Sequence, residues 1–311
     1  MITAGLLTRA AARLRPRLTT TALHTAVTAA STLHGSGPVL VLPPLRRVVV
    51  LAPHPDDETI GCGGTIARLA AAGTRVTVVA VTDGEATIGS PHGPRRTAEQ
   101  RRHELALACT QLGVGPPVTL GLPDGGLPRA SAPLVAAVRR ILDAEAPDAV
   151  FAPWPLEAHA DHRAVTRALV TAAAVDTTVY GYEAHTPIPA PTHVFDITPT
   201  LARKRAALRA HATAGLAFDL EACLGLARWR SLATGAGRGA AEAFLCARAA
   251  DLRPVMDAAD AAHTAAHAPG RVAGTAPDVP GPPTRAGRRL THSDLASERL
   301  PLPSPRGRAR G

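Results

Sequence analysis

Residues 48–64 read VVVLAPHPDDETIGCGG, an apolar run followed by a polar turn and a glycine-rich segment. Five consecutive apolar residues, Val48 to Ala52, are typical of a strand that is buried on both faces of a parallel sheet. The glycines predict a tight turn, and residues 65–72 predict a helix that ends at Gly73. The chain therefore contains a strand–turn–helix unit whose turn carries most of the polar groups.

The same alternation continues through the middle of the chain. Further strands are predicted at 76–81, 118–120, 149–152 and 177–182, and further helices at 97–112, 131–145 and 164–174. Ser131 is expected to cap the helix that it begins. Strands that alternate with helices indicate βαβ units, and hence an α/β fold with a mostly parallel sheet and helices on both faces. Ligands of such sheets bind beyond the carboxyl ends of the strands.

Composition narrows the class of protein. The chain has 311 residues, of which 46% are hydrophobic and 19% charged, so a large core can form. No run approaches 18 apolar residues, so we expect no membrane-spanning helix. The 4 cysteines form no CxxC pair, which argues against a cysteine-rich zinc module and a disulfide framework. Reduced thiols predict a cytoplasmic protein.

The net charge of +9 lies in the ends of the chain, because residues 48–253 hold 20 basic and 20 acidic side chains. A balanced domain argues against a nucleic-acid partner, which would require a basic face. We expect a weakly ordered arm over 1–45, a folded α/β domain over 46–253, and a disordered Pro/Gly/Arg-rich tail over 254–311. The Ala/Asp/His-rich start of that tail, 254–268, is compatible with a frayed helix.

Two polar segments follow predicted strands. His54, Asp56, Asp57 and Glu58 crowd into five positions after the first strand. Burying like charges together is costly unless a cation or a shared proton offsets them, although an acidic helix start is also common. After the fourth strand the chain reads HADH over 159–162, which places two imidazoles on one face of a helical turn. A chance HxxH is unremarkable among 13 histidines.

The combination of the two segments is more specific than either alone. Both follow parallel strands, so the fold is expected to bring them to one edge of the sheet. Two imidazoles and a carboxylate with open positions suit Zn²⁺ or another first-row divalent metal. The leftover acid and histidine are the groups that metal-assisted hydrolysis needs, one to take a proton from water and one to protonate the leaving nitrogen.

These motifs resemble those of the PIG-L (LmbE-like) family of zinc-dependent N-deacetylases. The resemblance rests first on the sequence APHPDDE over 52–58 together with HADH over 159–162. Supporting matches are Thr82-Asp83-Gly84-Glu85, Arg101 with Glu104, Leu122-Pro123-Asp124-Gly125, Tyr182-Glu183, Asp196-Ile197, Lys204 with His211, and Glu242-Ala243-Phe244. The similarity extends from about residue 46 to residue 250.

The resemblance implies a Rossmann-like fold and a role for each site residue. The implied metal ligands are His54, Asp57 and His162. The implied catalytic residues are Asp56 as general base, His159 as acid or oxyanion stabiliser, and Asp161, which orients a histidine. Arg101 is expected to hold the substrate or a loop.

Two segments depart from the family pattern. Leu156-Glu157-Ala158 precedes the second histidine motif, and Ala212-Thr213-Ala214 follows His211 where the family commonly has Ser-Gln. These departures concern substrate contacts and leave the metal chemistry intact.

Three functions are therefore weighed. The first is a metal-dependent hydrolase that removes an N-acetyl or N-acyl group from an amino-sugar conjugate such as one of N-acetylglucosamine. The second is an amide hydrolase with the same machinery that acts on a thiol conjugate or an acylated natural product. The third is a non-catalytic nucleotide or nucleic-acid binding module. The segment GCGG over 61–64 does not complete a GxGxxG motif, which disfavours a dinucleotide site.

Overall fold

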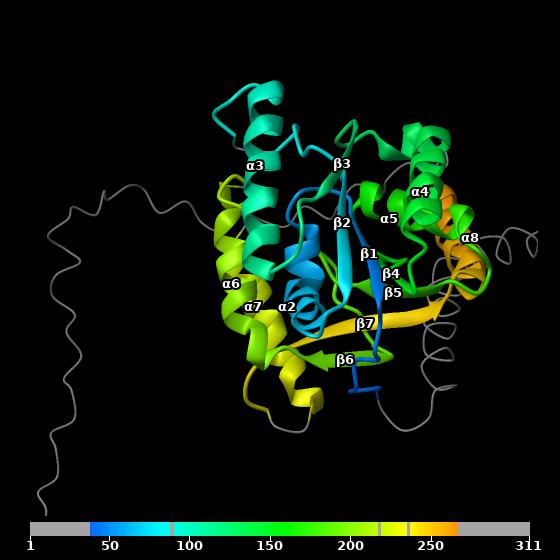
Figure 1. Cartoon of the computed structure of the whole chain (residues 1–311). Helices are drawn as coiled ribbons and strands as arrows, with labels where there is room; N and C mark the ends of the chain where they lie inside the picture. The colour runs from blue at the N-terminus through cyan, green and yellow to red at the C-terminus, as the bar shows by residue number, and fades with distance from the viewer. Residues whose placement is uncertain (1–37, 88–89, 217–218, 235–236, 267–311) are drawn as a thin grey trace, which may run out of the picture. The chain divides into compact units, whose positions relative to one another are not determined.

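The structure is a computed structural model that describes residues 38–87, 90–216, 219–234 and 237–266 (Figure 1). Most of the predicted N-terminal arm, and the predicted tail beyond residue 266, lie outside the described residues.

Seven strands form one sheet in the order β3-β2-β1-β4-β5-β7-β6. Their bounds are β1 Arg47–Ala52, β2 Arg75–Thr82, β3 Val118–Leu122, β4 Ala149–Pro153, β5 Thr178–Tyr182, β6 His193–Asp196 and β7 Ala241–Arg248. Neighbours among β1–β5 pair in parallel, whereas β7 is antiparallel to both β5 and β6. The predicted α/β fold is confirmed, and the antiparallel edge is an addition to it.

Helices cover both faces of this sheet (Figure 1). One layer contains α2 Asp57–Ala71, α3 Pro94–Leu112, α6 Leu201–Ala210 and α7 Leu220–Arg230, and the other α4 Ser131–Glu145, α5 Ala160–Ala172 and α8 Ala249–Ala266. Val48 and Val50 pack into one hydrophobic core, and Val49 and Leu51 pack into the other. The uninterrupted apolar run of β1 is required because successive side chains point to opposite faces.

The glycine-rich segment lies inside α2 and does not precede it. The predicted turn before residue 65 is wrong, because the helix begins at Asp57 and is kinked at Cys62 (φ −143°, ψ 20°). The glycines are needed for close packing. A Cβ on Gly61 would stand 2.1 Å from the Tyr182 ring, and one on Gly64 would stand 2.6 Å from Ile197.

The start of α4 also differs from the prediction. Ser131 is the first residue of the helix, and Ala130 is its N-cap. A 3₁₀ turn over Leu127–Ala130 leads directly into α4 and replaces the side-chain cap.

The predicted domain boundary at residue 253 falls inside α8, which continues to Ala266. Met256 is fully buried against the core, and Arg167 of α5 forms ion pairs with Asp257 and Asp260 of α8. The first part of the segment predicted as a disordered tail is therefore helical. Within the described residues, no helix combines the length and apolar character that crossing a bilayer would need.

Candidate functional site

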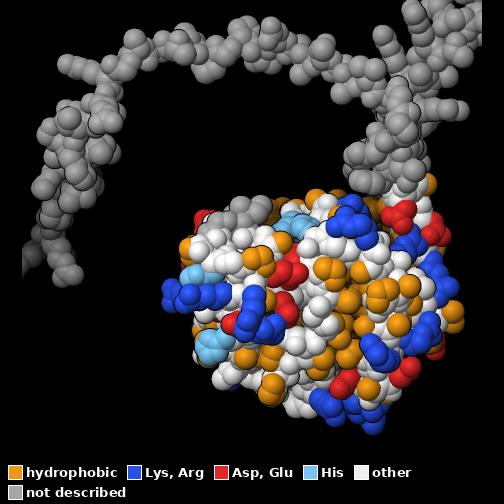
Figure 2. All heavy atoms as spheres, turned by 90° about the horizontal axis from the view of Figure 1, so that it is seen from above, with side chains coloured by type: hydrophobic (Ala, Val, Ile, Leu, Met, Phe, Trp, Pro, Cys, Tyr) orange, Lys and Arg blue, Asp and Glu red, His pale blue; other side chains and the backbone are white. Residues whose placement is uncertain are grey.

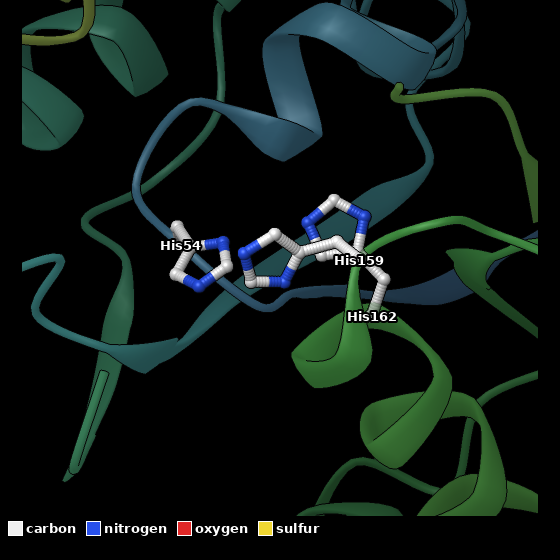
Figure 3. A group of neighbouring side chains, drawn as sticks. All are labelled: His54, His159 and His162. Atoms are coloured by element: carbon white, nitrogen blue, oxygen red, sulfur yellow. The ribbon is translucent and has the colours of Figure 1, made fainter. Parts of the chain in front are cut away.

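The two polar segments meet at the carboxyl ends of neighbouring strands. β1 and β4 pair directly, so the turn after β1 and the turn between β4 and α5 share one edge of the sheet. Figure 3 shows three imidazoles from these turns facing one another. The ring centroids of His54 and His162 lie 5.4 Å apart, and that of His159 lies 4.9 Å from the first and 4.8 Å from the second.

Asp57 joins the two turns. Its Oδ2 lies 3.1 Å from Nδ1 of His54 and 3.3 Å from Nε2 of His162. It also accepts the backbone N–H of His54 at 2.9 Å. Burial favours the protonated carboxyl, but the attraction of His162 and the hydrogen bond to His54 outweigh it and hold the pKa of Asp57 well below its usual range. The structure thus brings together the three residues that the resemblance implies as ligands.

The environment of His162 fits a metal ligand. This side chain has no exposed surface, and neither ring nitrogen forms a hydrogen bond, although a carboxylate oxygen lies 3.3 Å from Nε2 and another lies 3.5 Å from Nδ1. Buried polar atoms without a hydrogen bond are rare, and a metal ion bound at such an atom is one reason for them. Burial lowers the pKa of His162, yet Asp57 and Glu157 raise it to about 9, so this corner of the site attracts a cation. A nitrogen and carboxylate donor set of this kind suits zinc.

Glu157 faces the other side of the same imidazole. Its Oε2 lies 3.5 Å from Nδ1 of His162, and its carboxylate accepts backbone N–H groups of Ala184, His185 and Thr186 at 2.9, 3.2 and 3.1 Å. Glu157 therefore ties the turn after β4 to the segment after β5. The sequence marked Glu157 as a departure from the family pattern and as a specificity residue near the cleft, but its contact with His162 was not predicted.

Asp56 has an unusual backbone conformation, with φ 142° in a region that residues with a Cβ rarely adopt. Glu58 helps to hold it there, because its Oε2 accepts the Asp56 N–H at 3.0 Å. Strained residues of this kind cluster at functional sites. Burial raises the pKa of Asp56 to about 6, although Arg101 opposes the shift with Nη2 at 3.0 Å from Oδ2.

The hydrogen-bonding groups of Arg101 are mostly occupied by neighbouring residues of the protein. Its guanidinium donates to the carbonyl of Pro55 and, at 2.7 Å, to Oγ1 of Thr87. Only 6% of the residue is exposed. These contacts favour the loop-holding role for Arg101 over direct contact with a substrate.

A third loop reaches the site from β3. Asp161 accepts the backbone N–H groups of Gly125 and Leu127 at 2.7 and 3.2 Å, and its Oδ2 lies 3.4 Å from Nε2 of His54. Oδ1 of Asp124 lies 3.1 Å from the same nitrogen. Asp161 therefore stands where it can orient His54. Asp124 was matched as part of a motif but not predicted as a site residue.

The surroundings of His54 and His159 shift the pKa values of the two imidazoles in opposite directions. Burial lowers the pKa of His54, but hydrogen bonds to Asp124, Asp161 and Asp57 raise it well above its usual value. For His159, burial and the neighbouring His162 lower the pKa. His159 is half-buried at the start of α5, where its Nδ1 accepts the Asp161 N–H at 3.2 Å.

A buried ion pair holds the kink in α2 just beyond these residues. Glu242 of β7 accepts the N–H groups of Gly64 and Thr65 at 2.9 and 2.7 Å. Nζ of Lys204 donates to Glu242 and, at 2.8 Å, to the carbonyl of Ile60. The Glu242 carboxylate thus accepts the first N–H groups of the second half of α2, and Lys204 binds a carbonyl of its first half.

Residues 49–173 match the family described as PIG-L, GlcNAc-PI de-N-acetylase. A conserved protein of Thermus thermophilus, TT1542, is 31% identical, with a TM-score of 0.54 over 64% of this chain and 93% of that chain. The chain belongs to the PIG-L family.

Two further PIG-L relatives have described activities. The N,N'-diacetylchitobiose deacetylase of Pyrococcus horikoshii is 26% identical, with a TM-score of 0.58 over 66% of this chain and 85% of that chain. A 1D-myo-inositol 2-acetamido-2-deoxy-alpha-D-glucopyranoside deacetylase of Kineococcus radiotolerans is 42% identical over 85 residues, which are 26% of this chain. The chain spans about a quarter of the length of the first curated relatives that it matches.

Proposed function

We propose that this protein is a zinc-dependent hydrolase that removes an N-acetyl group from an amino-sugar conjugate. The observation that carries the proposal is the convergence of Asp57 with His54 and His162 at the edge of the sheet, where the buried His162 ring lies between two carboxylates and neither of its nitrogens forms a hydrogen bond. The activities of the relatives support the choice of an acetylated amino sugar, since they are named as deacetylases of such compounds. The proposal includes a cytoplasmic location, which is supported by the absence of a disulfide framework in the sequence.

The residue roles are those that the resemblance implies, and the contacts of the site support them. His54, Asp57 and His162 would hold the metal, which when bound supplies Lewis-acid polarisation to the amide carbonyl and to a water molecule. Asp56 is adjacent to this ligand set and accepts the proton of the attacking water. His159, whose Nδ1 accepts the Asp161 N–H, can donate its Nε2–H to the developing oxyanion, and the proton that Asp56 takes from water is passed on to the leaving nitrogen. Arg101 keeps the Asp56 turn in place.

The alternative of a nucleic-acid module receives less support. The face seen in Figure 2 carries basic and acidic side chains interspersed with one another and with apolar ones. Phosphate recognition favours a continuous basic surface.

The test measures acetate release from N-acetylglucosamine conjugates by zinc-loaded protein and by Asp56→Asn. The wild type is expected to release acetate. The variant is expected to bind zinc and to lose roughly 10²-fold or more in kcat, because general base catalysis typically contributes that much. A wild type that releases no acetate, or a variant as active as the wild type, would refute the proposal.

A further inference from the structure

A cavity of about 500 Å³ adjoins the proposed metal site on the side of α7. It is lined mainly by apolar side chains: Ile60, Ala184, Pro187, Ala222, Cys223 and Leu226. This volume is in the range of pockets that bind small molecules.

His185 connects the cavity to the site. It lines the cavity, and its ring centroid lies 5.0 Å from that of His162 and 5.9 Å from that of His159. Its backbone N–H is held by Glu157, so the shared wall is fixed to the turn that carries both histidines. Ile60 forms another wall and belongs to α2, the helix that carries Asp57. A group attached to a substrate at the site would be within reach of this cavity.

The two carboxylates that line the cavity, Glu183 and Asp219, already have partners within the protein. The Glu183 carboxylate is paired with Arg230 and accepts the N–H of Ile188 at 2.6 Å. Asp219 accepts the N–H of Glu221 at 2.9 Å, as the N-cap of α7. Among the described lining residues there is neither lysine nor arginine. A carboxylate or phosphate placed here would find no lysine or arginine among these lining residues and would lie near the Glu183 and Asp219 carboxylates, whereas an apolar group would bury its surface.

We propose that this cavity is a subsite for an apolar, uncharged group of the substrate, such as the alkyl or aryl aglycone of an N-acetylated amino-sugar conjugate. The proposal rests on the proposed function for the chemistry at the adjoining site. It assigns specificity to the apolar walls from α2, α7 and the segment after β5.

Binding of inert glycosides tests the subsite without turnover. Calorimetry on the full zinc-loaded chain compares methyl, hexyl and 5-carboxypentyl β-D-glucopyranosides, which carry no acetamido group. The hexyl glycoside is expected to bind about tenfold or more tightly than the methyl glycoside, since each buried CH₂ is worth roughly a factor of four. The carboxypentyl glycoside is expected to lose that gain.

The variant Ala222→Glu places a charge in the cavity from an exposed position, so the fold should tolerate it. It is expected to abolish most of the gain of the hexyl glycoside. Ala136→Glu is the matched control, because Ala136 is exposed on α4 in the other helix layer, and it should keep the gain.

Equal binding of the hexyl and methyl glycosides by the wild type would overturn the subsite, as would a full gain in Ala222→Glu. Acetate release from hexyl and methyl N-acetylglucosaminides is measured in parallel. If the gain in binding is present and neither compound releases acetate, the proposed deacetylation fails while the subsite is supported.

Discussion

Replacing Lys204 by methionine should destabilise the protein more than most single substitutions. Lys204 is 1% exposed, and its Nζ donates to Glu242 at 2.5 Å and to the carbonyl of Ile60 at 2.8 Å. Methionine fills similar volume but cannot donate. It therefore leaves a buried carboxylate without its cation and a buried carbonyl without its donor.

The expected size of the effect follows from these two losses. Removing one partner of a buried ion pair typically lowers the free energy of unfolding by roughly 3–5 kcal/mol. Domains of ordinary stability have about 5–15 kcal/mol in total. Glu242 keeps its hydrogen bonds from the N–H groups of Gly64 and Thr65 in the variant. We therefore expect the loss in free energy of unfolding to be about 3 kcal/mol, the lower end of the range for buried ion pairs. The kink of α2 should also loosen, which moves Asp57 and weakens zinc binding.

Urea unfolding of the zinc-free protein measures the first effect, and a competitive chelator titration measures the second. Arg167→Met is the control, because its ion pairs to Asp257 and Asp260 lie at an exposed surface. Exposed pairs are worth about 0–1 kcal/mol, so this control should change little. The double variant Lys204→Met/Glu242→Gln should recover part of the loss by removing the unpaired charge. If Lys204→Met unfolds at the same urea concentration as Arg167→Met, the Lys204–Glu242 ion pair does not stabilise the kinked helix and this prediction is refuted.

Three other substitutions test separate parts of the structure. Gly61→Ala should lower the free energy of unfolding by about 1–3 kcal/mol, because its Cβ would clash with the Tyr182 ring, and an unchanged urea midpoint would contradict that packing. Glu157→Gln should weaken zinc binding by roughly 10–100-fold, because it removes the carboxylate that orients a ligand imidazole, and unchanged affinity would exclude that role. Burial lowers the pKa of His211, but the Glu58 carboxylate, whose Oε1 lies 3.0 Å from Nε2 of His211, has the larger effect and raises the pKa. The charged form of His211 therefore stabilises the fold. The stability difference between zinc-free wild type and His211→Asn should be largest below about pH 6.5 and shrink as the pH rises through the raised pKa, and a difference that grows with pH would reverse the assignment.

The parallel part of the fold was accessible from sequence because its strands are short, continuous apolar runs separated by amphipathic helices. β1 shows why, since both of its faces are covered from Val48 to Ala52 and each of these five positions must be apolar. The antiparallel edge was not accessible. β6 has four residues, and β7 begins with Ala241 and Glu242, so neither shows the pattern of a buried parallel strand.

The glycines of α2 were misassigned for a different reason. A run of glycines usually indicates a turn, but Gly61 and Gly64 serve close contacts with Tyr182 and Ile197, which are distant in sequence. Local propensity cannot reveal such contacts, because they depend on where the fold places β5 and the segment after β6.

The candidate site divides in the same way. His54, Asp57 and His162 lie in compact motifs directly after strands, and that placement was sufficient to predict that they would meet. Asp124 belongs to a matched motif that gave it no role, and Glu157 lies in a segment that departs from the family pattern. Their importance appears only in the distances to His54 and His162.

The most direct test of the account is the zinc content of purified His162→Ala and His185→Ala proteins beside the wild type. Both histidines lie in groups that could hold a metal, but only His162 belongs to the ligand set that joins the two turns. The account predicts one zinc per chain in the wild type and in His185→Ala, and loss of zinc in His162→Ala. Full zinc content in His162→Ala, or loss of zinc in His185→Ala alone, would contradict it.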